Sequence, residues 1–355
     1  MIKKHAKDYK LEDVASFEKL MQAHYRARKC KRHKKDVILF EVNMFYYLTM
    51  LEKALLDGTY SIKRYKKFYV YEPKEREIQA LEYYDRVVQN SICHNFLTPY
   101  FSRRLIYDNA ACQKNKGTHF CRNRLEGFLH GFFKTHGING YFLKMDIKKY
   151  FNNIDHEILK QKLGYIADPR LRKLIYHIVD SYSHNVPGKG VPMGNQSSQT
   201  FALYYLDSVD RLIKEKYRIK YYVRYMDDLI VIHHSKEYLQ KLYDEVKQEI
   251  AKLKLELNKK SEIIPIKNGV EFLGVRYRLL KSGKLLKRMK HQSKMRMVGK
   301  IKALKHRYKL HLCPKEEVEM SLAGFHGNIK RLTVDGLRVK YLCPLKKLIS
   351  KKDAQ

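Results

Sequence analysis

The sequence lacks the features of several common protein classes. It has no tryptophan, and its six cysteines are scattered without a C-x-x-C pair, which excludes a disulfide framework and favours free thiols in a reducing compartment. Cys112, His119 and Cys121 are close in sequence, but a structural zinc site usually needs two tight ligand pairs, so zinc is not favoured. No run reaches the roughly 18 apolar residues of a spanning helix, and the first ten residues lack the apolar stretch of a signal peptide. We therefore expect a soluble, cytoplasmic chain.

Acidic residues are scarce beside basic ones: 37 Asp and Glu stand against 73 Lys and Arg, for a formal net charge of +36. Self-repulsion of this size destabilises a compact state unless a polyanion neutralises it. The expected partner is nucleic acid. An anionic membrane surface is the weaker alternative, and no membrane partner is expected. Hydrophobic residues make up 44% of the chain, which is enough for a core. The length of 355 residues suggests two or three domain-sized units.

Helical and strand patterns are mixed along the chain, without an internal repeat or a low-complexity linker. Residues 1–58 have a helical pattern with an apolar stripe through Phe40, Val42, Phe45, Leu48 and Leu51. Asp155 is expected to cap a helix over 155–163, and residues 221–234 to form a β-hairpin with two carboxylates at its turn. Further helices are predicted over 81–97, 198–214, 236–255 and 288–310, strands over 60–71, 141–146 and 272–281, and a polar loop over 107–119.

Three carboxylates, Asp146, Asp227 and Asp228, lie beside apolar residues of β type. An ionised carboxylate is costly there unless it is paired or bound to a metal, and a divalent cation makes such a cluster of acids tolerable. Mg²⁺ is usually bound through a few carboxylates and substrate phosphates. Two such ions can clamp the attacking and leaving oxygens of a phosphoryl transfer. On the pattern alone, an ordinary acidic turn at Asp227-Asp228 is equally well supported.

Sequence boxes around these acids resemble those of a known family. YMDD at 225–228 resembles the YxDD box of reverse transcriptases, and FLKMDIKKYFNNIDH, around Asp146, resembles their first palm motif. GVPMGNQSSQ resembles their template- and nucleotide-positioning motif, and LKLELNKKS and FLG resemble the fourth and fifth palm motifs. Upstream, YEPKEREIQ, YYDRVVQNSI and DNAACQKNKGTH resemble the fingers motifs. Because the boxes follow the family's order over roughly residues 58–280, the sequence resembles the bacterial reverse transcriptases.

The resemblance implies an α/β (α+β) fold of the right-hand polymerase type. A basic helical N-terminal extension is expected over 1–57, fingers over 58–135, and a palm with the active site, an antiparallel sheet packed on helices, over 136–275. A basic thumb and C-terminal tail would follow over 276–355. The implied activity is that of an RNA-directed DNA polymerase, a nucleotidyltransferase that copies a template RNA into cDNA. Its implied cofactor is a pair of Mg²⁺ ions, for which Mn²⁺ can substitute, and its substrates are dNTPs.

The resemblance also implies roles for the acids and their neighbours. Asp146 and Asp227 would be the metal ligands, with Asp228 as the supporting acid. The backbone of Ile147 would lie beside the metal and the triphosphate.

Further roles concern the incoming nucleotide. Phe151 matches the steric gate that excludes a 2′-hydroxyl, whereas the residue type alone favours ordinary core packing. Lys260, or its neighbour Lys259, fits the general acid that protonates pyrophosphate. The other nucleotide-binding candidates are Lys74, Arg76, Met193, Gly194, Asn195 and Gln199.

The residue before the motif glycine indicates the subgroup. Most reverse transcriptases have Gln there, whereas this sequence has Met193 followed by GNQSSQ, which resembles the enzymes of diversity-generating retroelements. Those enzymes make mutagenised cDNA, with errors concentrated at adenines. Losing an amide that hydrogen-bonds the nascent pair should weaken discrimination against mispairs. Defence-associated (anti-phage) bacterial reverse transcriptases share related boxes and are the alternative; group II intron-like and retron enzymes are more remote.

Residues 272–315 contain fifteen Lys or Arg and no Asp or Glu, which exceeds what solubility requires. Apolar residues interleave at helical spacing, so one face can pack while the other follows phosphates; they are Leu285, Leu286, Met289, Met295, Val298, Ile301 and Leu304. The resemblance implies that a thumb that grips an RNA/DNA duplex would sit here. The basic N-terminal helix would be a second such surface, for template RNA or for a protein partner. The nucleic-acid-binding candidates are Lys114, Lys116, Lys287, Arg288, Lys290 and Lys294. A small basic accessory protein is implied by the retroelement resemblance alone.

Two other function classes are weaker. An RNA-binding scaffold that has lost catalysis is disfavoured because Asp146, Asp227 and Asp228 are intact. An RNA-dependent RNA polymerase is disfavoured by Phe151, since a small residue is expected at the gate of such an enzyme.

Overall fold

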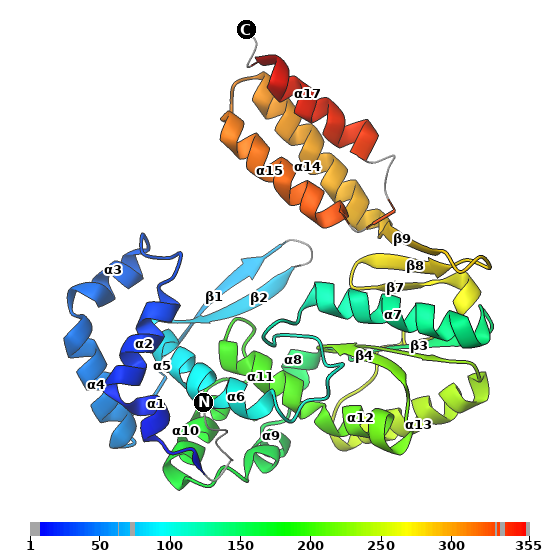
Figure 1. Ribbon diagram of the computed structural model, residues 1–355. Coiled ribbons are helices and arrows are strands. Elements are labelled where there is room, and N and C mark those ends of the chain that lie inside the picture. The colour runs from blue at the N-terminus through cyan, green and yellow to red at the C-terminus, as the bar shows by residue number, and fades with distance from the viewer. Residues whose placement is uncertain (1–7, 63, 72–74, 331, 334–337, 353–355) are drawn as a thin grey trace. The chain divides into compact units, whose positions relative to one another are not determined.

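The computed structural model describes residues 8–62, 64–71, 75–330, 332–333 and 338–352. The chain divides into two compact units. One comprises Met1–Cys121, Met145–Ile230 and Gln240–Ser261, and the other Arg122–Lys144, Val231–Leu239 and Glu262–Gln355. Each unit is therefore assembled from segments that are distant in sequence, and Figure 1 follows the chain through them from blue to red.

The first unit is mainly helical. Its helices are α1 (Glu12–Ala15), α2 (Phe17–Ala27), α3 (Lys35–Val42), α4 (Met44–Leu56), α5 (Tyr83–Ile92), α6 (Thr98–Phe101), α8 (Tyr150–Asn153), α9 (His156–Leu163), α10 (Pro169–Asp180), α11 (Gln196–Tyr205) and α12 (Asp207–Arg211), with π-helical turns at Cys93–Leu97 and Leu212–Lys216. Its strands are β1 (Tyr65–Val70), β2 (Arg76–Leu81) and β4 (Tyr221–Tyr225). Four elements run from one unit into the other: α7 (Thr118–His136), β3 (Tyr141–Asp146), β5 (Asp228–His233) and α13 (Lys236–Lys252).

Helix α5 is the centre of the N-terminal helical group. It buries Val87, Val88 and Ile92 and is in contact with α1, α2, α3 and α11. Each fully buried aliphatic side chain contributes roughly 1.5–3 kcal/mol. The antiparallel hairpin β1–β2 lies next to α5 in the sequence, with Tyr65 opposite Leu81 and Val70 opposite Arg76.

The apolar stripe expected through residues 40–51 is only partly buried. Phe40, Leu48 and Leu51 are in the core, but Val42 is 74% exposed and Phe45 is 66% exposed. The reason is a break between α3 and α4 at Asn43, whose φ of −118° and ψ of 35° are not helical. The apolar residues before and after Asn43 therefore do not lie on one continuous helix face.

A four-stranded sheet has the order β4-β5-β3-β6, where β6 is Glu262–Pro265. Strand β3 pairs with β6 in antiparallel fashion, with Tyr141 opposite Pro265 and Lys144 opposite Glu262. The predicted hairpin over 221–234 is confirmed as β4 and β5. Asp155 caps α9, as predicted, by accepting a hydrogen bond from the backbone N–H of Ile158 at 3.1 Å. The mixture of helices with antiparallel strands is the α+β class that the sequence predicts.

The second unit contains an antiparallel sheet of β7 (Val270–Phe272), β8 (Val275–Leu279) and β9 (Leu285–Met289), in that order. Strand β9 corrects one expectation: Leu285, Leu286 and Met289 lie on a strand, and helix α14 starts only at His291. The five β9 residues pair in register with β8, from Val275 opposite Met289 to Leu279 opposite Leu285. Cross-strand pairing with a distant segment therefore outweighs the local helical spacing.

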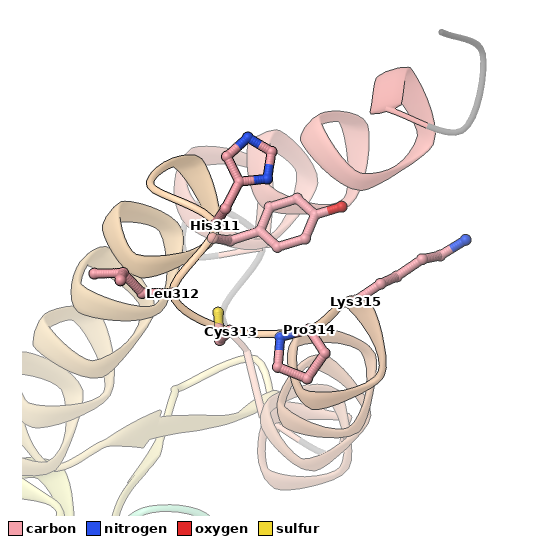
Figure 2. A pocket seen from close by; sticks show the side chains of 6 residues that line it. His311, Leu312, Cys313, Pro314 and Lys315 are labelled. Atoms are coloured by element: carbon pink, nitrogen blue, oxygen red, sulfur yellow. The ribbon is translucent and has the colours of Figure 1, made fainter.

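Three helices of the second unit form a bundle: α14 (His291–Lys309), α15 (Lys315–Ile329) and α17 (Cys343–Lys352), with a π-helical turn at Arg338–Leu342. Figure 1 shows them side by side. Their shared core confirms Val298, Ile301 and Leu304 of the predicted apolar face, whereas Met295 is exposed. A hollow of about 520 Å³ lies where α14 connects to α15 (Figure 2), and no carboxylate is among its lining residues, which are Tyr308, His311, Leu312, Cys313, Pro314 and Lys315.

Candidate active site

The three acids are positioned by the ends of two neighbouring strands. Strand β3 ends at Asp146, and β5, its neighbour in the sheet, begins at Asp228. The turn between β4 and β5 consists of Met226 and Asp227, and Met226 has a left-handed φ of +56°. The sequence predicts both acids of the pair at the turn, and the structure places Asp227 there and Asp228 at the start of the strand.

The charges around Asp227 show which groups lie close to it. Burial raises the pKa of its carboxyl, and the negative charge of Asp146 raises that pKa further. The positive charges of Arg76 and Arg224 act in the opposite direction. The charges of Asp146 and of the nucleotide-binding candidate Arg76 therefore both act on the Asp227 carboxyl.

Asp146 is held by a segment about 110 residues further along the chain. The side-chain amide of Asn258 donates to its Oδ2 at 2.9 Å, and the backbone N–H of Asn258 donates to its carbonyl at 2.6 Å. The backbone N–H of Asp146 donates to Ser261 Oγ at 3.2 Å, and Ile147 forms a β-bridge with Leu257. The sequence reasoning did not single out Asn258 or Ser261, although both lie in the LNKKS box that resembles a palm motif.

Phe151 lies on the short helix α8 just after Asp146. The helix follows Lys149, whose φ is +48°, and is anchored by Tyr150, which is buried and donates a hydrogen bond to the carbonyl of Ala202. Phe151 is half-buried, and its carbonyl accepts from Val191 N at 2.9 Å. Tyr150 therefore anchors α8 in the core, and the ring of Phe151 remains partly exposed.

Met193 and Gly194 lie against strand β2. The backbone N–H of Gln79 donates to the carbonyl of Met193 at 3.0 Å. Gly194 has a φ of +133°, and a Cβ there would lie 3.0 Å from the Gln79 carbonyl oxygen and 3.2 Å from Ile78 Cγ2. Both the backbone conformation and the close approach therefore require glycine at this position.

The remaining nucleotide-binding candidates differ in exposure. Arg76 is exposed at the start of β2, and Gln199 is exposed on α11, whereas Asn195 is buried just before α11. Lys260 is exposed, and its backbone N–H donates to Asn258 Oδ1 at 3.2 Å. Lys74 lies outside the described residues.

The loop before α7 contains one exposed lysine and one lysine whose ammonium is hydrogen-bonded. Lys114 is exposed. The ammonium of Lys116 donates to the carbonyls of Tyr107 at 2.7 Å and Asn109 at 3.1 Å and to Gln113 Oε1 at 3.3 Å. Burial lowers the pKa of Lys116. Lys116 thus stabilises the loop from within.

The basic candidates of the second unit divide in the same way. Lys287 forms an ion pair with Glu126 at 3.0 Å, and Lys290 forms one with Glu271 at 3.0 Å. The other two members of the set are exposed; they are Arg288 and Lys294.

The donors near the sheet end fit a magnesium site that substrate completes. Within the described ranges, no group of three or more His, Cys, Asp or Glu side chains is arranged to hold one metal ion. Mg²⁺ does not require such a cage, because it is commonly bound by one or two carboxylates with substrate phosphates and water. The mutual repulsion of Asp146 and Asp227 is the condition that a divalent cation relieves.

Comparison with known proteins identifies the family. Residues 67–277, more than half of the chain, match the family model described as reverse transcriptase (RNA-dependent DNA polymerase). The chain belongs to the reverse transcriptase family. The match includes all three acids and the GVPMGNQSSQ segment, and it ends within β8 of the second unit.

One similar solved structure is that of apo telomerase from Candida tropicalis truncated from its C-terminal domain, at 14% identity and a TM-score of 0.47. The alignment covers 64% of this reverse transcriptase and 55% of that chain, so the reverse transcriptase spans about half the length of that structure. No curated protein matches the sequence. Among the helices of the described ranges, none has both the length and the apolar character needed to cross a bilayer.

Proposed function

We propose that this reverse transcriptase is an RNA-directed DNA polymerase that copies a template RNA into cDNA from dNTPs. The observation that supports this most is the placement of the acids: Asp146 ends β3, and Asp227 and Asp228 lie just before and at the start of the neighbouring strand β5. The charges of Asp146 and Arg76 both act on the Asp227 carboxyl. Carboxylates for divalent ions beside a cation for phosphates are the groups that nucleotidyl transfer needs.

In the proposed mechanism the 3′-hydroxyl of a primer attacks the α-phosphate of a dNTP, and pyrophosphate leaves. When bound, two Mg²⁺ ions, or Mn²⁺ in their place, lower the barrier by stabilising the attacking and leaving oxygens. Asp146 and Asp227 are the residues that would hold them, with Asp228 as the supporting acid and the backbone of Ile147 beside the triphosphate. Arg76 and Lys74 bind the triphosphate, and Lys260 gives a proton to pyrophosphate.

The selection of the nucleotide is assigned to residues around the acids. The half-exposed ring of Phe151, next to the anchored Tyr150, is proposed to block a 2′-hydroxyl. Gly194 lets Met193 approach β2 closely, and Asn195 and Gln199 complete the motif that orients the nucleotide and the template.

The activity is tested by primer extension on an RNA template with dNTPs and Mg²⁺. We expect cDNA from the wild type and none from Asp227→Asn. A matched control is Asp244→Asn, the same substitution at an exposed residue of α13, which should extend at the wild-type rate. Loss of activity in both variants, or in neither, would contradict the assigned role of Asp227.

For the subgroup, we propose a mutagenic enzyme of a diversity-generating retroelement, on the basis of Met193 in place of Gln. A defence-associated anti-phage enzyme is the second candidate. Sequencing of the cDNA from a mixed-sequence template separates the two: errors clustered opposite template adenines support the first, and uniformly accurate cDNA would exclude it.

We propose fingers over residues 58–135, a palm over 136–275 and a thumb over 276–355. Within this thumb, helix α14 is proposed to be part of the surface that binds template RNA and the RNA/DNA duplex. Exposed Lys294 lies on this helix and Arg288 just before it, and residues 272–315 contain no acid. Basic side chains on this surface can bind the phosphates of a nucleic acid whatever its nucleotide sequence. Lys294→Glu should raise KM for template–primer and leave kcat unchanged, whereas an equal kcat loss would argue against a duplex contact.

We also propose that the N-terminal extension over 1–57 binds the small basic accessory protein. Its helices α3 and α4 expose Leu39, Val42 and Phe45. Leu39 also lines a hollow of about 480 Å³, together with Asp36, Lys66 and Glu82 among others. Exposed apolar side chains suit a protein partner more than an RNA. Co-purification with a basic protein encoded beside this chain, abolished by Phe45→Glu, is the expected result; retention by Phe45→Glu would contradict it.

A further inference from the structure

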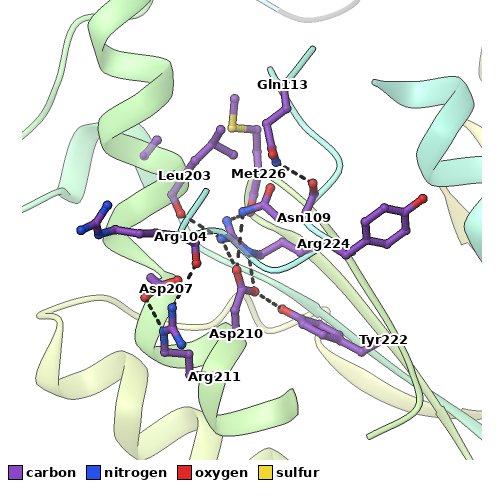
Figure 3. Close-up of polar contacts among 12 residues, drawn as sticks. Arg104, Asn109, Gln113, Leu203, Asp207, Asp210, Arg211, Tyr222, Arg224 and Met226 are labelled. Atoms are coloured by element: carbon purple, nitrogen blue, oxygen red, sulfur yellow. Dashed lines mark hydrogen bonds and ion pairs between the residues drawn. The ribbon is translucent and has the colours of Figure 1, made fainter. Parts of the chain in front are cut away.

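An arginine and an aspartate form a fully buried ion pair directly beneath the turn of the candidate active site. Arg224 of β4 and Asp210 of α12 each have a side-chain exposure of 0%. The guanidinium donates from Nε to Asp210 Oδ1 at 2.8 Å and from Nη2 to Asp210 Oδ2 at 2.5 Å. Tyr222 also donates to Asp210 Oδ1 at 2.6 Å. Figure 3 shows these groups converging from the strand and the helix.

The same guanidinium extends beyond its carboxylate partner to two backbone carbonyls. Nη1 donates to the carbonyl of Met226 at 3.0 Å, and Nη2 donates to that of Leu203 on α11 at 2.9 Å. Met226 is the residue with the left-handed φ of +56°, immediately before Asp227. Arg224 thus ties the strained residue of the turn to two helices of the same unit.

Stability alone does not account for this arrangement. Taking both charges out of water is expensive, and replacing a buried ion pair by apolar residues of similar size is often neutral or stabilising. A non-glycine residue in the left-handed region persists only where its surroundings enforce it. Here the enforcing contact comes from the guanidinium of Arg224, whose planar set of N–H donors can bond to a carboxylate and two carbonyls at once. A lysine ammonium lacks this planar set of donors.

We propose that Arg224, fixed by Asp210, is a positioning residue that sets the turn at Met226 and thereby aims the Asp227 carboxylate at the metal. This inference rests on the proposed polymerase function. Because the Arg224 side chain is fully buried and its contacts are with the protein interior, its effect should be seen in kcat and in the metal requirement, while KM for template–primer should stay unchanged.

The test uses the double variant Arg224→Met/Asp210→Leu, which removes both charges together. We expect a melting temperature below that of the wild type, because the buried Tyr222 hydroxyl loses its acceptor. In the folded protein we expect a kcat lower by about 10–100-fold, as misplacement of a reacting group produces, and a several-fold rise in the Mg²⁺ concentration for half-maximal rate. Arg211→Met is the matched control. Arg211 also lies on α12 and pairs with Asp207 and Glu215, but it makes no contact with the turn, so its rate should be that of the wild type.

A second variant keeps the test decisive if the double variant does not fold. Arg224→Lys retains a cation beside Asp210 and gives up the planar set of N–H donors, so it should fold and still show the kcat and Mg²⁺ effects. Wild-type kcat and Mg²⁺ dependence in folded Arg224→Lys and in the folded double variant would overturn the inference.

Binding of Mn²⁺, followed by electron paramagnetic resonance, separates this inference from the polymerase proposal. Weaker Mn²⁺ binding in Arg224→Lys than in the wild type supports the positioning role even if neither protein extends a primer. Failure of both proteins to extend a primer would overturn the polymerase proposal alone. Equal Mn²⁺ affinity together with equal kcat would overturn the positioning role.

Discussion

Asn258 is expected to be essential for the rate of the reaction although it is not a metal ligand. Its amide donates to Asp146 Oδ2 at 2.9 Å, and the contact links segments that are 112 residues apart. A hydrogen bond to a charged group is worth about 1.5–3 kcal/mol when it is buried. Because both residues are only half-buried, we expect Asn258→Ala to cost about 1–2 kcal/mol of unfolding free energy.

The effect of Asn258→Ala on catalysis should be of similar size. A carboxylate that is free to rotate away from the metal loses the geometry of the transition state, and about 1.4–2.7 kcal/mol of barrier corresponds to a 10–100-fold lower kcat. Single-turnover primer extension at saturating dNTP measures this. The matched control is Glu256→Ala, which removes an exposed ion pair with Lys148 from the same segment and should change neither rate nor stability by much. An Asn258→Ala enzyme with wild-type kcat would refute the idea that this amide orients Asp146.

Three further predictions concern single residues. Burial and Asp146 raise the pKa of Asp227 above 3.8, so the unfolding free energy without metal should fall as the pH rises from 3.8 through the raised pKa, and Mg²⁺ should reverse this fall. In EDTA at neutral pH, Asp227→Asn should therefore melt about 1–3 °C higher than the wild type. An unchanged melting temperature would argue against repulsion between the two acids. Phe151→Val should raise incorporation of ribonucleotides about 10–100-fold relative to deoxynucleotides, as gel-resolved extension can measure, and unchanged selectivity would exclude a gate. Met193→Gln should lower the error frequency opposite template adenines about 10-fold in sequenced cDNA, and an equal error spectrum would separate this side chain from fidelity.

The elements that local chemistry determines could be predicted from the sequence. Asp155 is a cap because a carboxylate before a helix can accept from a free backbone N–H, and the contact is present. The hairpin around Met226 follows from two apolar runs that flank a pair of carboxylates, although the turn lies one residue earlier than predicted, at Met226 and Asp227. In both cases the decisive interaction lies within a few residues of the pattern that predicts it.

Errors arose where partners distant in sequence decide the outcome. Leu285 and Leu286 have helical spacing with their C-terminal neighbours, yet pairing with β8 makes them part of a strand. Val42 fits an apolar stripe, yet the break at Asn43 turns it outward. Neither the register of a strand pair nor a change of helical phase is visible in the spacing of apolar residues alone.

The candidate site shows the same division between local pattern and distant support. The acids themselves could be found because carboxylates among β-type residues are unusual and their motifs are specific. Their supports could not: Asn258 and Arg224 are ordinary polar residues whose partners, the carboxylate of Asp146 and the carbonyl of Met226, are identified only by the fold. This division has a physical reason. Asp146 raises the pKa of Asp227, so the two acids oppose their own proximity, and the interactions that hold them together must come from groups outside the motif.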